Sequence, residues 1–214
     1  PMLMPGRPRH RLADQAAAQG DWNGLSLSVA LAHAEQSQPK LALAERLEPA
    51  IVGNHTLAMR VQAQILGGSQ AVALLERAKD LGDPVAFSGW YQAVKTNANN
   101  PSKTQDSLDQ ILKLYKAGNQ AVRDDFTDSR QALPRTLVKA LQARLKYLGH
   151  LSDTPDGLWG NNTQAAFDTA SKSNKSIQAM IDVRARMEEK QKAASKGTKL
   201  RRSAKGIPIP GVKP

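Results

Sequence analysis

A chain of 214 residues, with 40% hydrophobic and 23% charged side chains, has room for one large domain or two small ones. It contains no cysteine, which excludes disulfides, thiolate metal sites and a thiol nucleophile. It also lacks a run of about 18 apolar residues, so we expect no transmembrane segment.

The net charge of +11 is concentrated at the C-terminal end. The segment from Lys190 to Pro214 carries eight of the 30 basic residues and none of the 19 acidic ones. Such a segment attracts polyanions through Coulomb forces and counterion release. We expect residues 193–214 to form a basic flexible tail that contacts anionic polymers, with nucleic acid as the weaker alternative.

The N-terminal residues 1–10 contain three prolines and are predicted to form an extended arm. They include no apolar stretch of the kind found in a signal peptide. Whether a cleaved signal precedes Pro1 stays open at this point.

Residues 11–130 are predicted to form a domain of short helices, because apolar side chains recur there at helical spacing, as in LAMRVQAQIL and AVALLERAKDLG. Four glycine-polar pairs separate these helices at intervals of 33, 29 and 36 residues: Gly20-Asp21, Gly53-Asn54, Gly82-Asp83 and Gly118-Asn119. In each pair we expect the glycine to end one helix and the polar side chain to cap the next.

The regular interval indicates a helix-turn-helix repeat, whose units bury their faces by stacking. AVALLERAKDLGDPVA (residues 71–86) resembles the second helix and exit turn of a Sel1-like repeat, a relative of the tetratricopeptide repeat, and LDQILKLYKAGNQAV (residues 108–122) is a weaker second copy. The resemblance covers residues 54–122 and implies a surface for protein partners. The alternative is an irregular alanine-rich bundle in which the glycines are only caps.

The C-terminal module begins with LPRTLVKALQARLKYLGH, which places four leucines on one helical face: Leu137, Leu141, Leu145 and Leu148. Gly149 is expected to end this helix, and Asp156-Gly157 to form a turn in which the glycine takes a positive φ. Asn161 or Asn162 then caps a second helix.

The ordered set LVKALQARLKYLG and DGLWGNNTQAAF is similar to the peptidoglycan-binding domain type 1 family over residues 134–175. The resemblance implies a small non-catalytic helical module, within residues 131–192, that tethers a neighbouring domain to the bacterial cell wall. The family's second Asp-Gly turn is missing, and SIQAMIDVRARMEEKQK (residues 176–192) is expected to supply the third helix.

The resemblance further implies that peptidoglycan is bound in a shallow polar groove beside the turn. The residues that match this region are Tyr147, Asp156, Gly157, Trp159, Asn161, Asn162 and Thr163. Within this set we expect Trp159, with Leu158, to fill the core and Asp156 to cap the turn, which leaves binding mainly to Asn161 and Thr163, themselves candidate helix caps.

Catalytic and metal-site patterns are weak in this sequence. His150 and Asp153 have the spacing of some zinc ligands, but no third ligand lies nearby. Glu35, in AHAEQSQP, faintly resembles the catalytic region of lytic transglycosylases, without an evident aromatic-rich sugar cleft. We therefore expect no enzyme, metal or cofactor, and keep a divergent peptidoglycan hydrolase as an alternative.

Together these features predict an all-α, non-catalytic protein of the bacterial periplasm or cell envelope. Its C-terminal module is expected to bind peptidoglycan and its repeat domain to contact protein partners, for example in a secretion or conjugation machine. A phage virion or lysis-associated protein that contacts the cell wall is the further alternative.

Overall fold

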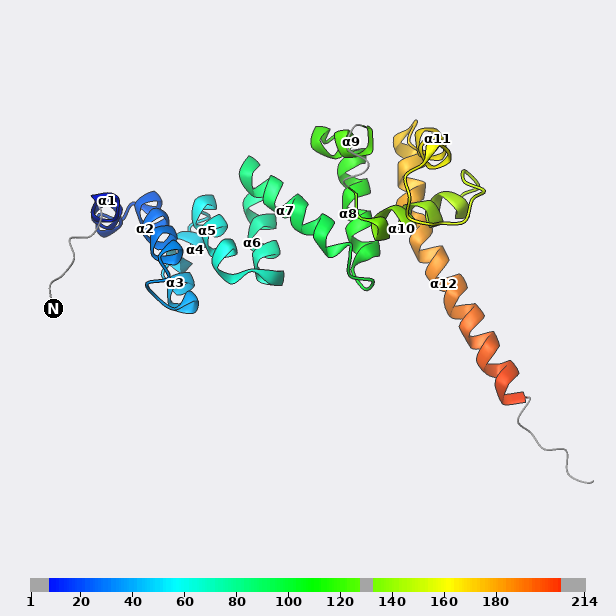
Figure 1. The fold of residues 1–214 in the computed structure, drawn as a ribbon, viewed down its shortest axis with the longest axis horizontal. Coiled ribbons are helices and arrows are strands. Elements are labelled where there is room, and N and C mark those ends of the chain that lie inside the picture. The colour runs from blue at the N-terminus through cyan, green and yellow to red at the C-terminus, as the bar shows by residue number, and fades with distance from the viewer. Residues whose placement is uncertain (1–7, 128–132, 205–214) are drawn as a thin grey trace, which may run out of the picture. The chain divides into compact units, whose positions relative to one another are not determined.

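The computed structural model describes residues 8–127 and 133–204, and all the regular structure in them is α-helical, as the sequence predicts (Figure 1). The helices are α1 (Pro8–Ala18), α2 (Trp22–Ala34), α3 (Lys40–Glu45), α4 (Glu48–Val52), α5 (Thr56–Leu66), α6 (Gly68–Asp80), α7 (Pro84–Asn97), α8 (Thr104–Lys116), α9 (Gln120–Thr127), α10 (Arg135–Tyr147), α11 (Asn161–Ala170) and α12 (Asn174–Ala204). None of these helices is long and apolar enough to cross a membrane.

The chain divides into two compact units, unit 1 (Pro1–Val94) and unit 2 (Lys95–Pro214). The sequence placed a boundary between residues 130 and 131, which lies outside the described residues. The division falls earlier because α8 packs against both α10 and α12 and so belongs to unit 2.

Unit 1 is built from closely packed, alanine-rich helices. Helix α2 packs against α1 and α5, and α5 also contacts α3, α4 and α6. Where α1 and α2 pack together, a Cβ atom added at Gly24 would lie 2.4 Å from the Cβ of Ala16. The core of the unit is formed by Val29, Ala32, Leu43, Ala44, Leu47, Ala50, Ile51, Ala58, Met59, Val61, Ile65, Ala78 and Ala86.

Three of the four glycine-polar pairs form the expected helix junctions. The glycines have φ angles of +81°, +88° and +83° at Gly20, Gly82 and Gly118. The following side chains accept hydrogen bonds from backbone N–H groups of the next helix at Asp21, Asp83 and Asn119. Each junction thus joins a left-handed glycine to an N-capping side chain.

The fourth junction differs from the prediction by one residue. Gly53 has a φ of −74°, and Asn54 takes the left-handed conformation with a φ of +62°. His55 then caps α5, because its Nδ1 atom accepts a hydrogen bond of 3.3 Å from the N–H of Ala58. Asparagine tolerates the left-handed region better than other residues with a side chain, which explains the shift.

The helices of unit 1 are uneven, from five residues in α4 to 14 in α7. Two short helices, α3 and α4, both pack against α5. The Sel1-like or tetratricopeptide-like repeat therefore stays a prediction, beside its alternative of an irregular bundle.

Unit 2 is built around α8, α10 and α12, with α9 and α11 at its edges. Leu137, Leu141 and Leu145 of α10 are fully buried, as the sequence predicts, whereas Leu148 is half-buried. A cluster of aromatic rings joins four elements of the unit. Its members are Tyr115, Phe126, Trp159 and Phe167, with ring centroids 4.7–5.7 Å apart.

Both ends of the described chain are more helical than the sequence predicted. Residues 8–10 begin α1 instead of ending an extended arm, since proline is favoured in the first turn of a helix. Residues 1–7 and 205–214 lie outside the described part. Helix α12 continues over residues 193–204, where a flexible tail was expected, because alanine, lysine and arginine there favour a helix and no proline interrupts it.

Candidate functional site

The loop between α10 and α11 is fixed by Gln142, a buried side chain on α10. Its Oε1 atom accepts hydrogen bonds from the N–H groups of Asp156 (3.0 Å) and Gly157 (2.8 Å). Its Nε2 atom lies 2.9–3.0 Å from three acceptors: Asp156 Oδ1, Leu158 O and Thr163 Oγ1. Since Nε2 carries only two hydrogens, the three acceptors share them. One side chain therefore fixes both the turn and the start of α11.

The turn itself requires glycine at position 157. Gly157 has a φ of +81°, a conformation that residues with a side chain rarely adopt. A Cβ atom there would also lie 2.6 Å from the carbonyl oxygen of Arg135, at the start of α10. The predicted Asp-Gly turn is thus present, and it packs directly against the α10 backbone.

The carboxylate of Asp156 caps this turn, as the sequence predicts. Its Oδ1 atom accepts hydrogen bonds from the N–H of Leu158 (2.8 Å) and from Gln142 Nε2 (3.0 Å). The bond from Leu158, followed by that from Gln142, keeps the pKa of Asp156 below its ordinary value. Asp156 is therefore charged at neutral pH, on an exposed edge of the loop.

Asp156 and the first turn of α11 line a hollow of about 330 Å³. We call it the α11 hollow; it is lined by Gln142, Asp153, Thr154, Asp156, Leu158, Gly160, Asn161, Asn162 and Thr163. Helix α11 begins after Gly160, so neither Asn161 nor Asn162 is the cap that the sequence predicted. Within the described residues no side chain caps the N–H groups of its first turn.

The polar side chains at the α11 hollow differ in how far they are engaged. Asn162 Nδ2 donates to Asp153 Oδ2 at 2.8 Å, and the buried Thr163 accepts from Gln142. Asn161 is exposed and has no hydrogen-bond partner within the described residues. The hollow thus offers carboxylate acceptors together with an amide that can both donate and accept, a combination suited to hydroxyl and amide groups.

The structure brings together four of the residues predicted from the sequence, Asp156, Asn161, Asn162 and Thr163, while Gly157 shapes the turn beside them. Tyr147 lies elsewhere, at the end of α10. Its ring is 41% exposed, and its centroid is 5.8 Å from Lys190 Nζ of α12.

Trp159 and Leu158 have different surroundings, although both were expected in the core. Trp159 is half-buried, packs edge-on against Phe126 and Phe167, and donates from Nε1 to Gln164 Oε1 at 2.8 Å. Leu158 is 55% exposed and lines the α11 hollow, which corrects the expectation for this residue. The carbonyl oxygen of Leu158 accepts a hydrogen bond from Gln142 on the buried side of the loop, and its side chain points toward the surface.

Two residues of the site were not expected there from the sequence: Gln142 was not singled out, and Asp153 was considered only as a possible zinc ligand with His150. The available signal for Gln142 was the Leu-Gln pair in LVKALQARL, a polar residue between leucines of the apolar face. For Asp153 the spacing from His150 indicated a metal ligand and gave no sign of a contact with the start of α11. Asp153 contributes because Asn162 reaches it from nine residues away.

The residues considered for catalysis lie apart from this site in the chain. Glu35 has a side chain that is 44% exposed, with Oε1 at 3.0 Å from His10 Nε2. It lacks the apolar surroundings in which the acid of a glycosidase lies. Across residues 8–127 and 133–204, no group of three histidine, aspartate or glutamate side chains could bind a metal ion.

No family model, curated protein or solved structure matches this chain. The resemblances to peptidoglycan-binding and Sel1-like families therefore rest on the residues quoted for them.

Proposed function

We propose that the chain is a non-catalytic protein of the bacterial cell envelope that binds peptidoglycan at the α11 hollow. The observation that supports this most strongly is the arrangement around Gln142. A single buried amide positions the Asp156-Gly157 turn and the start of α11, so that polar groups from both face one hollow.

The chemistry of the α11 hollow fits the polar parts of peptidoglycan. Its sugars present hydroxyl and N-acetyl groups, and its stem peptides present amides. Asp156 and Asp153 supply acceptors for such N–H and O–H donors, and the amide of Asn161 is free to donate and accept. The exposed Leu158 adds an apolar edge against which a sugar face or a methyl group packs.

A binding role also agrees with how rigidly the hollow is built. Its walls are fixed by hydrogen bonds from a buried side chain, and Trp159 holds the same loop by packing against Phe126 and Phe167, so little ordering is left for ligand binding. In this proposal unit 2 attaches the chain to the wall, and unit 1 offers its helices to protein partners of an envelope machine.

Co-sedimentation of the full chain with purified peptidoglycan sacculi tests the proposal. We expect the wild type to pellet with sacculi at about 0.15 M salt and at roughly 0.5 M salt, where contacts made only by exposed charges are screened. Asn161→Ala removes an exposed amide that has no partner within the described residues and should weaken binding about fivefold, the effect of one net hydrogen bond.

The matched control is Asn99→Ala, which removes an exposed amide from the loop before α8 and should bind as the wild type does. A wild-type chain that stays in the supernatant at both salt concentrations removes the proposal. Equal binding by the Asn161→Ala and wild-type chains moves the site away from the α11 hollow.

A further inference from the structure

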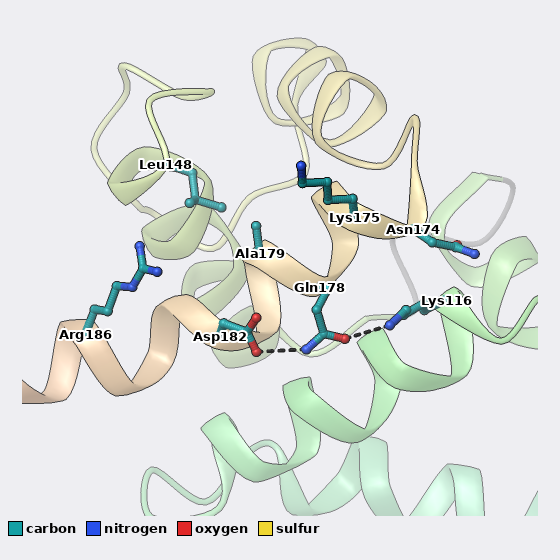
Figure 2. Close-up of a pocket in the computed structure, with 8 residues that line it drawn as sticks. All are labelled: Lys116, Leu148, Asn174, Lys175, Gln178, Ala179, Asp182 and Arg186. Carbon is teal, nitrogen blue, oxygen red and sulfur yellow. Dashed lines mark hydrogen bonds between the residues drawn. The ribbon is translucent and has the colours of Figure 1, made fainter.

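A second hollow in unit 2, of about 450 Å³, lies along one face of α12 (Figure 2). We call it the α12 groove; its main lining residues are Lys116, Leu148, Lys175, Ala179, Asp182 and Arg186. The α12 residues follow one another at intervals of four, three and four, so they form one stripe along the helix. Figure 2 shows Leu148 and Ala179 between the side chains of Lys175 and Arg186.

The groove combines cations with an apolar floor. Lys175 and Arg186 are exposed, and within the described residues neither side chain has an ion-pair or hydrogen-bond partner. Arg184, only two residues before Arg186, is fully engaged by Asp106, Asp109 and Glu188. The charges of Lys175 and Arg186 are therefore not used in the internal ion pairs of unit 2.

Lys175 is also placed where a positive charge is unfavourable. It lies in the first turn of α12, and that turn contains no acidic residue. The N-terminal end of a helix carries a partial positive charge, so a lysine there is repelled and an anion is attracted. An anionic group bound beside Lys175 would interact favourably with the lysine and with the N-terminal end of α12.

The other polar side chains of the groove, apart from Asn174, are hydrogen-bonded to one another. Lys116 Nζ donates to Gln178 Oε1 at 2.7 Å, and Gln178 Nε2 donates to Asp182 Oδ1 at 2.8 Å (Figure 2). These two hydrogen bonds lie along the side of the stripe away from Leu148 and Ala179. They leave one cation free toward each end, with Leu148 and Ala179 between them.

We propose that the α12 groove binds an acidic segment of a protein partner, with carboxylates at Lys175 and Arg186 and an apolar side chain on Leu148 and Ala179. Arg186 lies eleven positions after Lys175, about 16 Å along the helix axis. An extended peptide covers that distance in about five residues. The segment recognised is thus a short one, acidic at both ends and apolar in the middle.

The composition of the groove favours a peptide over a polyanion such as nucleic acid. A phosphodiester chain repeats its charge evenly and gains nothing from Leu148 and Ala179. It is also repelled by Asp182, which lies on the stripe between the cations. A peptide has backbone N–H groups that donate hydrogen bonds to Asp182, and it can place an apolar side chain on Leu148 and Ala179.

Fluorescence anisotropy with the full chain tests this inference. The probe is a fluorescein-labelled peptide about seven residues long, with two acidic residues at each end and a central leucine. Lys175→Gln with Arg186→Gln should weaken its binding about tenfold at physiological ionic strength, as two exposed ion pairs would contribute. Ala179→Glu, which keeps both cations but places a carboxylate on the floor, should weaken binding similarly.

The matched control is Lys113→Gln with Lys139→Gln, which removes the same charge from exposed positions outside the groove and should change binding less than twofold. The inference is overturned if the groove variants bind the peptide as the wild type does, or if the control loses as much. It is also overturned if a peptide with glycine in place of leucine, or polyphosphate of equal charge, shows the same dependence on the groove, since the site then reads charge alone.

Discussion

In unit 1 the carboxylate of Asp83, with 8% of its side chain exposed, pairs with the partly exposed Arg60 and caps the helix that follows it, whereas unit 2 buries the charge of Arg144 completely. Arg144 has no exposed side-chain surface, and its guanidinium contacts Asp109 Oδ1, Gln105 Oε1 and the carbonyl oxygen of Met180. It thereby joins α8, α10 and α12. Desolvation lowers the pKa of Arg144 from its ordinary value, against the opposing effect of Asp109.

The difference shows two ways of fixing helices in place. The charged caps of unit 1, such as Asp21 and Asp83, bond backbone groups two or three residues away. Arg144 depends on partners that lie 35 to 39 residues away in the chain. The loss of a cap costs about 1 kcal/mol, whereas a buried charge left without its partner costs several times as much.

The largest effect should come from cutting unit 2 at the boundary that the sequence suggested. A fragment of residues 131–214 lacks α8 and α9, which supply Asp109, Gln105 and two rings of the aromatic cluster. We expect it to show no cooperative thermal unfolding by circular dichroism, and a fragment of residues 95–214 to unfold cooperatively. Cooperative unfolding of the shorter fragment would show that Arg144 does not bind the helices into one unit.

The next largest effect should come from Asp109→Ala, which leaves the buried Arg144 without its carboxylate. Removing one partner of a buried pair costs about 3–5 kcal/mol in the free energy of unfolding. Arg144→Met should cost about half as much, because Asp109 keeps its ion pair with Arg184 and an apolar side chain fills the space.

Urea unfolding measures these differences, with Trp159 as the reporter after Trp22 and Trp90 are replaced by phenylalanine. Asp106→Ala is the matched control, because this 62% exposed carboxylate also pairs with Arg184 and should contribute less than about 1 kcal/mol. If Asp109→Ala and Asp106→Ala cost the same, burial of the charge is not what distinguishes unit 2.

The sequence predicted those features of the fold that depend on neighbouring residues. The helix junctions at Gly20, Gly82 and Gly118 need only a left-handed glycine and a polar cap, and both are visible locally. The leucine face of α10 follows from spacing. The burial of Arg144 was not predictable, because an arginine on a helix ordinarily reaches solvent. Its partners Asp109 and Gln105 also lie on a helix far away in the sequence.

The candidate site shows the same limit. The Asp156-Gly157 turn and the contact of Trp159 with the core could be predicted, since they follow from the positive φ of glycine and the size of indole. The outward position of Leu158 could not, because it depends on which loop carbonyl bonds to Gln142. Tyr147 is nearby in sequence, but it ends α10 and its ring lies against Lys190 of α12, a contact that the spacing does not reveal.

A medium effect is expected from Gly157→Ala, which combines a strained φ with a close approach to the carbonyl of Arg135. We expect a loss of about 3 kcal/mol in the free energy of unfolding. Gly149→Ala in unit 2 and Gly82→Ala in unit 1 impose a positive φ with open space around the added carbon, and should each cost about 1 kcal/mol. Equal costs at all three positions, measured by urea unfolding, would mean that the α10 backbone yields at the turn.

The smallest effect belongs to a unit 1 cap, Asp83→Ala at the start of α7, with an expected cost of about 1 kcal/mol at neutral pH. Burial acts to raise the pKa of Asp83, but hydrogen bonds from the Ala86 N–H and Thr56, together with the charge of Arg60, hold it below its ordinary value. A carboxylate with a lowered pKa contributes stability above its unfolded pKa, about 3.9, and loses it as pH falls through the folded value.

The stability difference between wild type and Asp83→Ala should therefore be constant from pH 7 to about pH 5 and shrink below about pH 4. Urea unfolding followed through Trp90, the tryptophan of α7, measures it in a chain whose other two tryptophans are replaced by phenylalanine. Asp83→Asn keeps an oxygen for the Val85 and Ala86 N–H groups but has no proton to gain, so its stability should differ from that of Asp83→Ala by an amount independent of pH. A wild-type advantage that persists unchanged at pH 3 would mean that the cap acts through its shape and not its charge, and the contrast with the buried charge of unit 2 would become sharper.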